Sequence, residues 1–295
     1  MSPQLALLVN PAARGGRTLR LLEPVARRLR AGGAELSVIV GDDATDALER
    51  ACTAVAERPD ALVAFGGDGL VHLAVQAVAG TDVPLGIIPV GTGNDIATAL
   101  GVPSKDPLAA ARTVLRMKSR QVDAARIVAG QADELFAGVV CCGFDSRVNE
   151  RANRRTWPPG MGRYLVAMVE ELRSFRPIPF RVTFDGSEVV EREAMLVAVA
   201  NTSSYGAGMR VCPDARPDDG LLDVMMLDAV SKTEFLRVFP SVYRGTHLTH
   251  RAVSVRRVRS VRLEAENVVA YADGERVGPV PVECEVRPGA LRVIV

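Results

Sequence analysis

The sequence predicts a two-domain protein with a doubly wound α/β domain followed by a mainly antiparallel β-sandwich domain. Two observations carry this prediction. Up to about residue 122, short runs that are apolar throughout alternate with stretches of helical apolar spacing, a pattern typical of a parallel sheet covered on both faces. Beyond it, many short runs alternate apolar and polar residues, which is typical of antiparallel strands with one buried face. We therefore place the domains at residues 1–125 and 126–295.

The first half predicts four strands with a helix between each successive pair. Asp42 or Asp43 is available as the N-cap of the second helix. The expected strands cover residues 4–9, 34–40, 60–65 and 83–90, and the expected helices cover 17–31, 43–58 and 70–80.

The second half predicts a series of strands interrupted by two helices. Asp185-Gly186 in "FRVTFDGSEVVE" is a hairpin signal. The expected strands cover residues 180–184, 193–201, 221–227, 260–266, 268–272, 282–286 and 291–295, and the expected helices cover 162–175 and 231–245.

Composition excludes several classes of protein. The formal net charge is +1, so electrostatics indicate no nucleic-acid partner. The five cysteines contain no CxxC pair, which favours a reducing cytoplasmic setting, and we expect Cys141 and Cys142 to be small core residues. No secretory signal precedes the first strand, and no run reaches the roughly 18 apolar residues of a membrane span. Any lipid contact is expected to be peripheral, at the inner membrane face.

Three predicted strands end in loops of unusual composition, "VNPAARGGR", "FGGDGL" and "PVGTGNDIA". Ligands of a doubly wound sheet bind beyond the carboxyl ends of its strands, where these loops would open together. Glycine permits positive φ and lets backbone N–H groups approach an anion, and a helix that starts there favours phosphate. Asp68 and Asp95 are candidate Mg²⁺ ligands. No GxxxxGK[ST] P-loop and no complete GxGxxG fingerprint is present.

Together these motifs resemble the diacylglycerol kinase family of ATP-dependent lipid kinases, which includes sphingosine kinases and soluble bacterial lipid kinases. The resemblance rests on Asn-Pro after the first strand, "GGDG" after the third and "GTGND" after the fourth. It continues through "NTSSYGAGMRVCPDARPDDGLLDVMML" and "AYADGERV", so it covers nearly the whole chain in order. It implies a Rossmann-like N-terminal domain similar to those of NAD kinases and phosphofructokinases.

The resemblance also implies site residues. Glu275 would be the general base, aided by Asp68 and Asp95, and catalysis would occur in the interdomain cleft. Asp219 would bind a structural Mg²⁺ through its side chain. The further Mg²⁺ contacts would be the carbonyls of Arg216 and Leu221, with Asp123 nearby; the alternative for Asp123 is an ordinary carboxylate at the domain junction. The expected ATP-binding residues are Asn10, Pro11, Ala12, Ala13, Arg14, Gly66, Gly67, Asp68, Gly69, Leu70, Gly91, Thr92, Gly93 and Asn94.

Several positions depart from the family pattern. Leu70 replaces the usual threonine after "GGDG", His72 and Leu73 replace asparagine and glutamate, and Ala13-Arg14 replace Ser-Gly. The family's threonine after its second strand has no counterpart in "VIVGDDAT". These changes leave open a nucleotide- or lipid-binding regulator that has lost catalysis. A second alternative is an NAD kinase-like enzyme that phosphorylates a dinucleotide ribose.

The main prediction is an ATP- and Mg²⁺-dependent lipid kinase, with diacylglycerol as acceptor and phosphatidic acid as product.

Several segments also have a purely structural interpretation. Asp273-Gly274 is typical of a plain hairpin turn, and His247 and His250 are expected to be packing or surface residues. The arginine-rich loop around Trp157 is either solvated or in contact with an anionic bilayer. Unpaired edge strands in the second domain would permit a homodimer.

Overall fold

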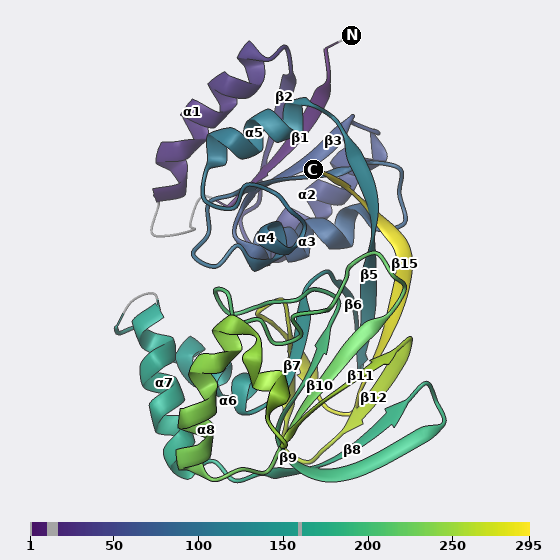
Figure 1. Cartoon of the computed structure of the whole chain (residues 1–295). Coiled ribbons are helices and arrows are strands. Elements are labelled where there is room, and N and C mark those ends of the chain that lie inside the picture. Colours follow the sequence, from purple (N-terminus) through teal and green to yellow (C-terminus); the bar gives the residue numbers. More distant parts are fainter. Residues whose placement is uncertain (1, 11–16, 159–160) are drawn as a thin grey trace. The chain divides into compact units, whose positions relative to one another are not determined.

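The computed structural model describes residues 2–10, 17–158 and 161–295, which form two compact units (Figure 1). Unit 1 contains the chain up to Ala124 and two later segments, Pro217–Asp219 and Arg287–Val295. Unit 2 contains Ala125–Arg216 and Gly220–Val286. The chain therefore returns twice to unit 1 after entering unit 2.

Unit 1 is built on a parallel sheet. Its neighbouring strands are parallel and follow the order β4-β3-β1-β2, and the end of β15 pairs with β4 through Val293 and Leu85. The strands are β1 (Gln4–Val9), β2 (Glu35–Val40), β3 (Ala61–Gly66) and β4 (Leu85–Pro89). β1, β3 and β4 are almost fully buried, as their continuous apolar runs predict, because helices cover both faces of such a sheet.

Five helices accompany this sheet: α1 (Arg17–Ala31), α2 (Ala44–Ala56), α3 (Asp68–Val78), α4 (Asp95–Ala99) and α5 (Pro107–Leu115). α1 packs on α5, and α2 packs on α3. Asp43 caps α2, because its carboxylate accepts a hydrogen bond from the N–H of Asp46 at 2.9 Å, as the sequence predicted. The sequence analysis did not predict α4 and α5, which are short. β5 (Ser119–Ala129) follows them and leads into unit 2.

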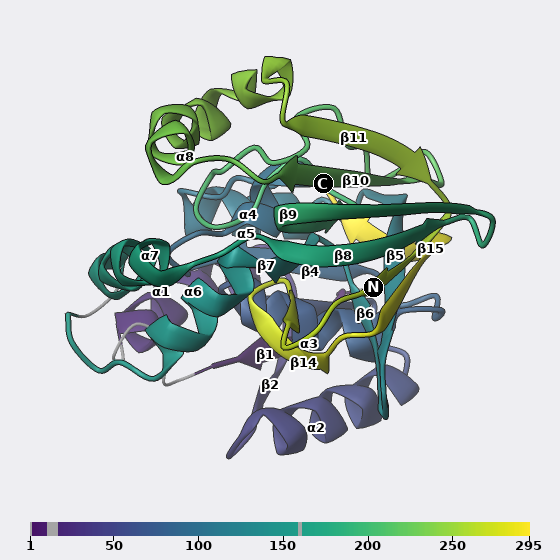
Figure 2. The ribbon, with the colours of Figure 1, turned by 90° about the horizontal axis from the view of Figure 1, so that it is seen from below.

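The strands of unit 2 are mainly antiparallel (Figure 2). The long strand β9 (Glu188–Ala200) pairs with three other strands. The first part of β9 pairs with β8, whereas its last part lies between β7 and β10. The remaining neighbours extend the sheet through β13 and β14, through β11, and through β12 and β15. The strands are β6 (Ala132–Phe136), β7 (Val139–Gly143), β8 (Ile178–Phe184), β9 (Glu188–Ala200), β10 (Leu222–Asp228), β11 (Val253–Val258), β12 (Ser260–Glu264), β13 (Val269–Ala272), β14 (Glu275–Pro279) and β15 (Val282–Ile294).

The helices of unit 2 are α6 (Phe144–Asn153), α7 (Met161–Ser174), α8 (Lys232–Val238) and the 3₁₀ turns η2 (Phe239–Arg244) and η3 (Thr246–Thr249). The prediction of one helix over 231–245 was wrong, because the chain tightens into 3₁₀ geometry at Phe239, with Pro240 in the next position. The strands predicted at 282–286 and 291–295 are one strand, β15. Cys141 and Cys142 are buried core residues of β7, which confirms that prediction.

Candidate functional site

The glycine loops after β3 and β4 lie against each other in unit 1. A Cβ added to Gly91 would lie only 2.5 Å from the Cα of Gly67. A Cβ added to Gly66 would lie 2.5 Å from the Cδ2 of Leu70. None of these three glycines has a positive φ, so their backbones do not use the left-handed region that glycine permits. Glycine is needed here because the two loops touch through their backbones.

Asn94 holds the second of these loops in shape. Its own φ of 58° is left-handed, and its side chain is 7% exposed. The amide oxygen accepts a hydrogen bond from the N–H of Gly91 at 2.9 Å, and the amide nitrogen donates to the carbonyls of Gly91 and Ser104. The asparagine of "GTGND" thus stabilises the conformation of its own loop through side-chain hydrogen bonds to the backbone. The resemblance implies an ATP-binding role for it as well.

Asp68 links the two loops from the side of α3. Its carboxylate accepts a hydrogen bond from the N–H of Ile96 at 3.1 Å, which ties the start of α3 to the first turn of α4. Asp95, the first residue of α4, is 8% exposed. Leu70 is also 8% exposed, because it packs beneath Gly66. The leucine that departs from the family pattern therefore lies in the core of unit 1.

The solvent side of this region carries the polar residues. Thr92 and Asn10 are exposed at the carboxyl ends of β4 and β1. Gly69 and Gly93 complete the two loops, and neither has a positive φ. The predicted ATP contacts at Pro11, Ala12, Ala13 and Arg14 lie outside the described residues.

Asp123 fixes the returning segment Pro217–Asp219 to β5. Its carboxylate accepts a hydrogen bond from the N–H of Gly289 at 2.8 Å, and its own N–H donates to the carbonyl of Pro217 at 2.7 Å. Asp218 pairs with Arg120 at 3.1 Å in the same unit. Asp123 is 4% exposed, so its carboxylate braces the junction where three stretches of chain meet.

The predicted Mg²⁺ contacts lie in the irregular stretch that precedes β10. Within the described part of the chain, no group of three or more histidine, cysteine, aspartate or glutamate side chains could hold a metal ion. The donors expected from sequence are instead the carboxylate of Asp219 and the carbonyls of Arg216 and Leu221. An all-oxygen set of this kind, completed by water, suits a hard divalent cation such as Mg²⁺.

Glu275 stands at the start of β14, directly after a tight turn. Asp273 and Gly274 have φ values of 54° and 90°, and Ala272 pairs with Glu275 across the turn, so the hairpin interpretation is confirmed. The Glu275 side chain is exposed. It is available to a substrate on the surface of unit 2.

Asp273 anchors that hairpin, a role that the sequence analysis missed. Its carboxylate accepts hydrogen bonds from three consecutive N–H groups, those of Ala137, Gly138 and Val139, at 3.1, 2.8 and 3.1 Å. The backbone N–H of Asn201 donates to the carbonyl of Gly138 and clamps the same loop from β9. The position of Glu275 is therefore fixed by its neighbour two residues earlier.

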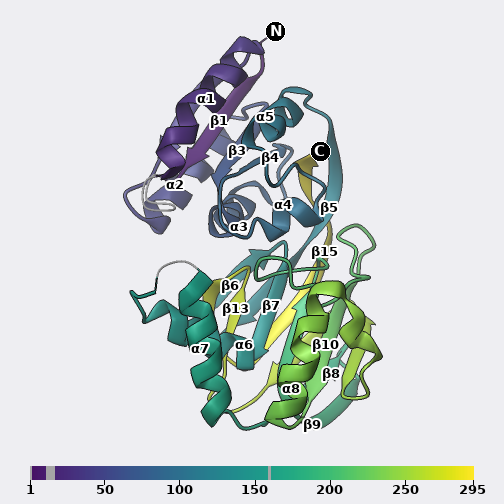
Figure 3. The same cartoon turned by 60° about the vertical axis from the view of Figure 1, so that its left-hand side comes forward.

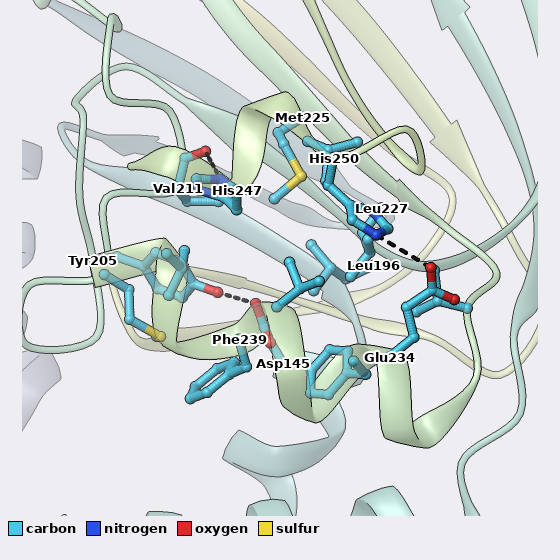
Figure 4. Close-up of a pocket in the computed structure, with 16 residues that line it drawn as sticks. Asp145, Leu196, Tyr205, Val211, Met225, Leu227, Glu234, Phe239, His247 and His250 are labelled. Carbon is cyan, nitrogen blue, oxygen red and sulfur yellow. Dashed lines mark hydrogen bonds and ion pairs between the residues drawn. The ribbon is translucent and has the colours of Figure 1, made fainter. Parts of the chain in front are cut away.

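A mainly apolar pocket opens in unit 2 beneath α8 (Figure 4). Eleven aliphatic, methionine and phenylalanine side chains line it, together with one tyrosine and four titratable residues. Tyr205 donates a hydrogen bond to the carboxylate of Asp145, and His250 pairs with Glu234 at 3.2 Å. Its walls come from residues 230–250, from β9, β10 and β11, from the irregular segment after β9 that contains Tyr205, and from the start of α6.

Burial changes the acid–base behaviour of two pocket residues. It raises the pKa of Asp145 to about 7, so this carboxyl is partly protonated at neutral pH. Burial also lowers the pKa of His247, opposed by the hydrogen bond that its Nε2 donates to the carbonyl of Val211 at 3.0 Å. His247 is buried and His250 is partly buried beside Glu234, in agreement with the prediction that the two histidines are packing or surface residues.

One sequence signal could have located this pocket. Asp145 follows "VVCCGF", an apolar strand that ends in a glycine of φ 108°, and polar residues just past a buried strand are candidates for a site. Tyr205 was noted within "NTSSYGAG", but no role was assigned to it. The pairing of the two required the fold, because they lie 60 residues apart in sequence.

Comparison with known proteins agrees with this geometry. The model of the diacylglycerol kinase catalytic domain matches residues 4–127, and that of the YegS C-terminal NAD kinase beta sandwich-like domain matches residues 138–295. A diacylglycerol kinase of Mycobacterium tuberculosis is 42% identical over 99% of this chain and 94% of its own. The chain belongs to the diacylglycerol kinase family. A diacylglycerol kinase of Bacillus subtilis is 32% identical over 94% of this chain and 91% of its own.

Two solved structures have the same two-domain fold as this chain. A diacylglycerol kinase from Bacillus anthracis matches with a TM-score of 0.74 at 24% identity, covering 99% of this chain and 96% of that one. An NAD kinase from Archaeoglobus fulgidus in complex with ATP matches with a TM-score of 0.53 at 13% identity, over 100% and 94% of the chains. The protein is therefore a kinase of the lipid kinase type, which confirms the predicted family, fold class and enzyme class. Among the described residues, no helix has both the length and the apolarity to cross a bilayer.

Proposed function

We propose that this kinase transfers the γ-phosphate of ATP, with Mg²⁺, to a lipid hydroxyl, and that diacylglycerol is the acceptor and phosphatidic acid the product. The observation that carries the proposal is the contact between the loops after β3 and β4. β3 and β4 are adjacent and parallel, so the glycine loops that follow them and the starts of α3 and α4 lie at the same edge of the sheet. Such an edge suits the phosphates of a nucleotide.

The residues divide the chemistry between them. Thr92, Asn10 and the loop backbone bind ATP, and Asp68 and Asp95 are the candidate ligands of the Mg²⁺ that accompanies it. Asp68 also ties the start of α3 to the first turn of α4. Asp219, through its side chain, and the carbonyls of Arg216 and Leu221 would hold a structural Mg²⁺, which would stabilise the stretch that precedes β10. Asp123 positions this segment through Pro217.

Glu275 acts as the general base. It accepts the proton of the acceptor hydroxyl as that oxygen bonds to the γ-phosphorus and the bond from phosphorus to the leaving oxygen of ADP breaks. The exposed side chain and its rigid turn support this role, because a base must reach a substrate without being buried itself. The apolar pocket beneath α8 supports a lipid acceptor, because its walls suit a hydrocarbon chain and its few polar groups suit an ester or hydroxyl.

The test is transfer of labelled phosphate from Mg·ATP to a panel of acceptors in mixed micelles. The panel contains diacylglycerol, phosphatidylglycerol, a sphingoid base and NAD. We expect phosphorylation of diacylglycerol and a loss of about 10²–10⁴-fold in Glu275→Gln, which keeps the shape and removes the base. Glu283→Gln, on an exposed glutamate of β15 in the same unit, is the matched control and should retain full activity.

The other outcomes identify the alternatives. Phosphorylation of NAD without any lipid would make the protein an NAD kinase-like enzyme. ATP binding without transfer to any acceptor would leave a nucleotide-binding regulator. Transfer that survives in Glu275→Gln at the wild-type rate would contradict the assigned base.

A further inference from the structure

The hairpin that carries Glu275 has two faces. In the ladder between β13 and β14, Ala272 pairs with Glu275, and Tyr271 pairs with Arg276. Because successive residues of a strand point to opposite faces, Tyr271 and Arg276 share one face of the hairpin and Glu275 lies on the other. Groups that contact Tyr271 and Arg276 can therefore hold the hairpin without obstructing Glu275.

Helix α6 makes these contacts. It packs on β13 (Figure 3). The Nε of Arg276 donates a hydrogen bond to the carboxylate of Glu150 at 3.1 Å, and the hydroxyl of Tyr271 hydrogen-bonds with the side chain of Asn153. Glu150 and Asn153 are three residues apart and lie on one face of α6. Two side chains of one helix thus contact two directly opposite residues of the hairpin, one on each strand.

The start of α6 is itself firmly anchored in unit 2. The hydroxyl of Ser146, which is 1% exposed, accepts a hydrogen bond from the N–H of Gly143 at 3.1 Å and donates to its carbonyl at 3.0 Å. The ring of Phe144 packs edge to face on Phe175 and Phe235, with centroid distances of 5.2 and 4.9 Å. A helix that is fixed in this way can hold a neighbouring hairpin in place.

The same helix reaches the apolar pocket. Asp145 is the second residue of α6, lines the pocket and accepts the hydrogen bond of Tyr205. Asp145 and Glu150 are five residues apart, which corresponds to about 7.5 Å along the helix axis at 1.5 Å per residue. α6 therefore connects the pocket to the hairpin of Glu275.

We propose that Arg276 and Glu150 are positioning residues for phosphoryl transfer. Their ion pair fixes the β13–β14 hairpin on α6 and so holds Glu275 where it takes the proton of the acceptor hydroxyl. The inference rests on the proposed function, because it requires Glu275 to be the general base. Since α6 also carries Asp145, the base is kept at a set distance from the pocket to which we assign the acceptor.

The exposure of the pair separates this role from a purely structural one. The Arg276 side chain is 54% exposed and that of Glu150 is 28% exposed. Ion pairs that are open to solvent contribute little to global stability. A small displacement of a catalytic group, by contrast, slows a reaction strongly. Loss of the pair should therefore affect turnover much more than folding.

The test is steady-state transfer of phosphate from Mg·ATP to diacylglycerol by Arg276→Gln, Glu150→Gln and the double variant. Each single variant should lower kcat about tenfold and leave the KM for ATP and the Tm nearly unchanged. The double variant should be no slower than either single one. Arg276→Lys keeps a cation within reach of Glu150 and should recover most of the loss.

The matched control is Arg181→Gln/Glu191→Gln, in the β8–β9 hairpin of the same unit. It removes a pair of the same length, 3.1 Å, whose arginine is 55% exposed, and it should keep the wild-type kcat. In a Glu275→Gln background, Arg276→Gln should lower the residual rate no further, because it acts only through Glu275. Wild-type kcat in both single variants, an equal loss in the control, or a further tenfold loss in the Glu275→Gln background would each overturn the proposal.

Hydrogen exchange tests the pair apart from catalysis. The amide protons of residues 269–279 should exchange faster in Glu150→Gln than in the wild type, whereas those of β8 and β9 should not change. Unchanged exchange in that variant of an active enzyme would refute the role of the pair alone. If the wild type phosphorylates no acceptor, the proposed function fails, and faster exchange of the hairpin would still show that Glu150 and Arg276 hold it.

Discussion

Gly67 and Gly91 belong to different loops, yet a Cβ added to Gly91 would lie 2.5 Å from the Cα of Gly67 and 2.7 Å from the Oδ1 of Asn94. Neither neighbour can move easily, because one is backbone and the other is hydrogen-bonded to the N–H of Gly91. This contact sets the spacing of the loops to which we assign ATP binding. Adding a single methyl group at Gly91, as in Gly91→Ala, therefore tests whether this contact matters for ATP binding.

Gly91→Ala is expected to separate the two loops. Crowding of this kind typically costs about 1–3 kcal/mol of unfolding free energy, and ATP affinity should fall with it. Thr92→Ala is the matched variant, because Thr92 is exposed in the same loop and its loss should lower ATP affinity without lowering the Tm. Calorimetric titration with ATP and thermal melting measure both. Wild-type affinity and Tm in Gly91→Ala would contradict the assignment.

Asp145→Asn should make the protein more stable at neutral and alkaline pH. The pKa of Asp145 is raised from 3.8 to about 7, so the native state holds this proton more tightly than the unfolded state does. Stability from this group is therefore intact below about pH 4 and is lost as the pH rises toward 7. The variant removes that loss, and its amide oxygen still accepts the hydrogen bond of Tyr205.

We expect the advantage of Asp145→Asn to be near zero at pH 4 and on the order of 1–3 kcal/mol at pH 8. Denaturant unfolding at several pH values measures it. Asp218→Asn, on an exposed aspartate that pairs with Arg120, should show no such gain with rising pH. An advantage of Asp145→Asn that is constant with pH would show that its carboxyl titrates normally.

Asp273→Asn should destabilise unit 2 and slow catalysis together. Asparagine tolerates the φ of 54°, but it replaces a charged acceptor of three backbone N–H groups with a neutral one. A hydrogen bond to a charged group contributes about 1.5–3 kcal/mol to stability. Because the asparagine keeps part of each bond, we expect the free energy of unfolding to fall by a few kcal/mol in total. Asp185→Asn in the β8–β9 hairpin, where the carboxylate accepts from two N–H groups at an exposed site, should cost less. Equal losses in the two variants, measured by thermal melting, would contradict the special role of Asp273.

Asp219→Asn should weaken the response to Mg²⁺. Binding of the ion to the native state alone raises stability in proportion to the logarithm of its concentration, so the Tm of the wild type should rise with MgCl₂. The variant should need a higher concentration for the same rise. Asp214→Asn, at an exposed aspartate of the same stretch, is the control. A wild-type Mg²⁺ response in Asp219→Asn would remove this residue from the proposed site.

The sequence by itself determined the family, the fold class and the order of the elements from β1 to β4. β1, β3 and β4 are apolar throughout because helices cover both faces of their sheet, and the caps and turns at Asp43 and Asp185-Gly186 are local signals. The motif residues around Asp68, Asn94 and Glu275 were likewise visible as short, ordered patterns. Such features depend on neighbours a few positions away.

Only the tertiary structure decided what those residues touch. The contact of Gly67 with Gly91, the three N–H groups on Asp273 and the pair of Tyr205 with Asp145 join residues 24, 134–136 and 60 positions apart. No local pattern encodes such contacts, because they follow from strand pairing and from the packing of whole elements. The sequence placed glycine after β3 and β4, whereas the fold showed that close backbone approach, and not a left-handed φ, is the reason it is there.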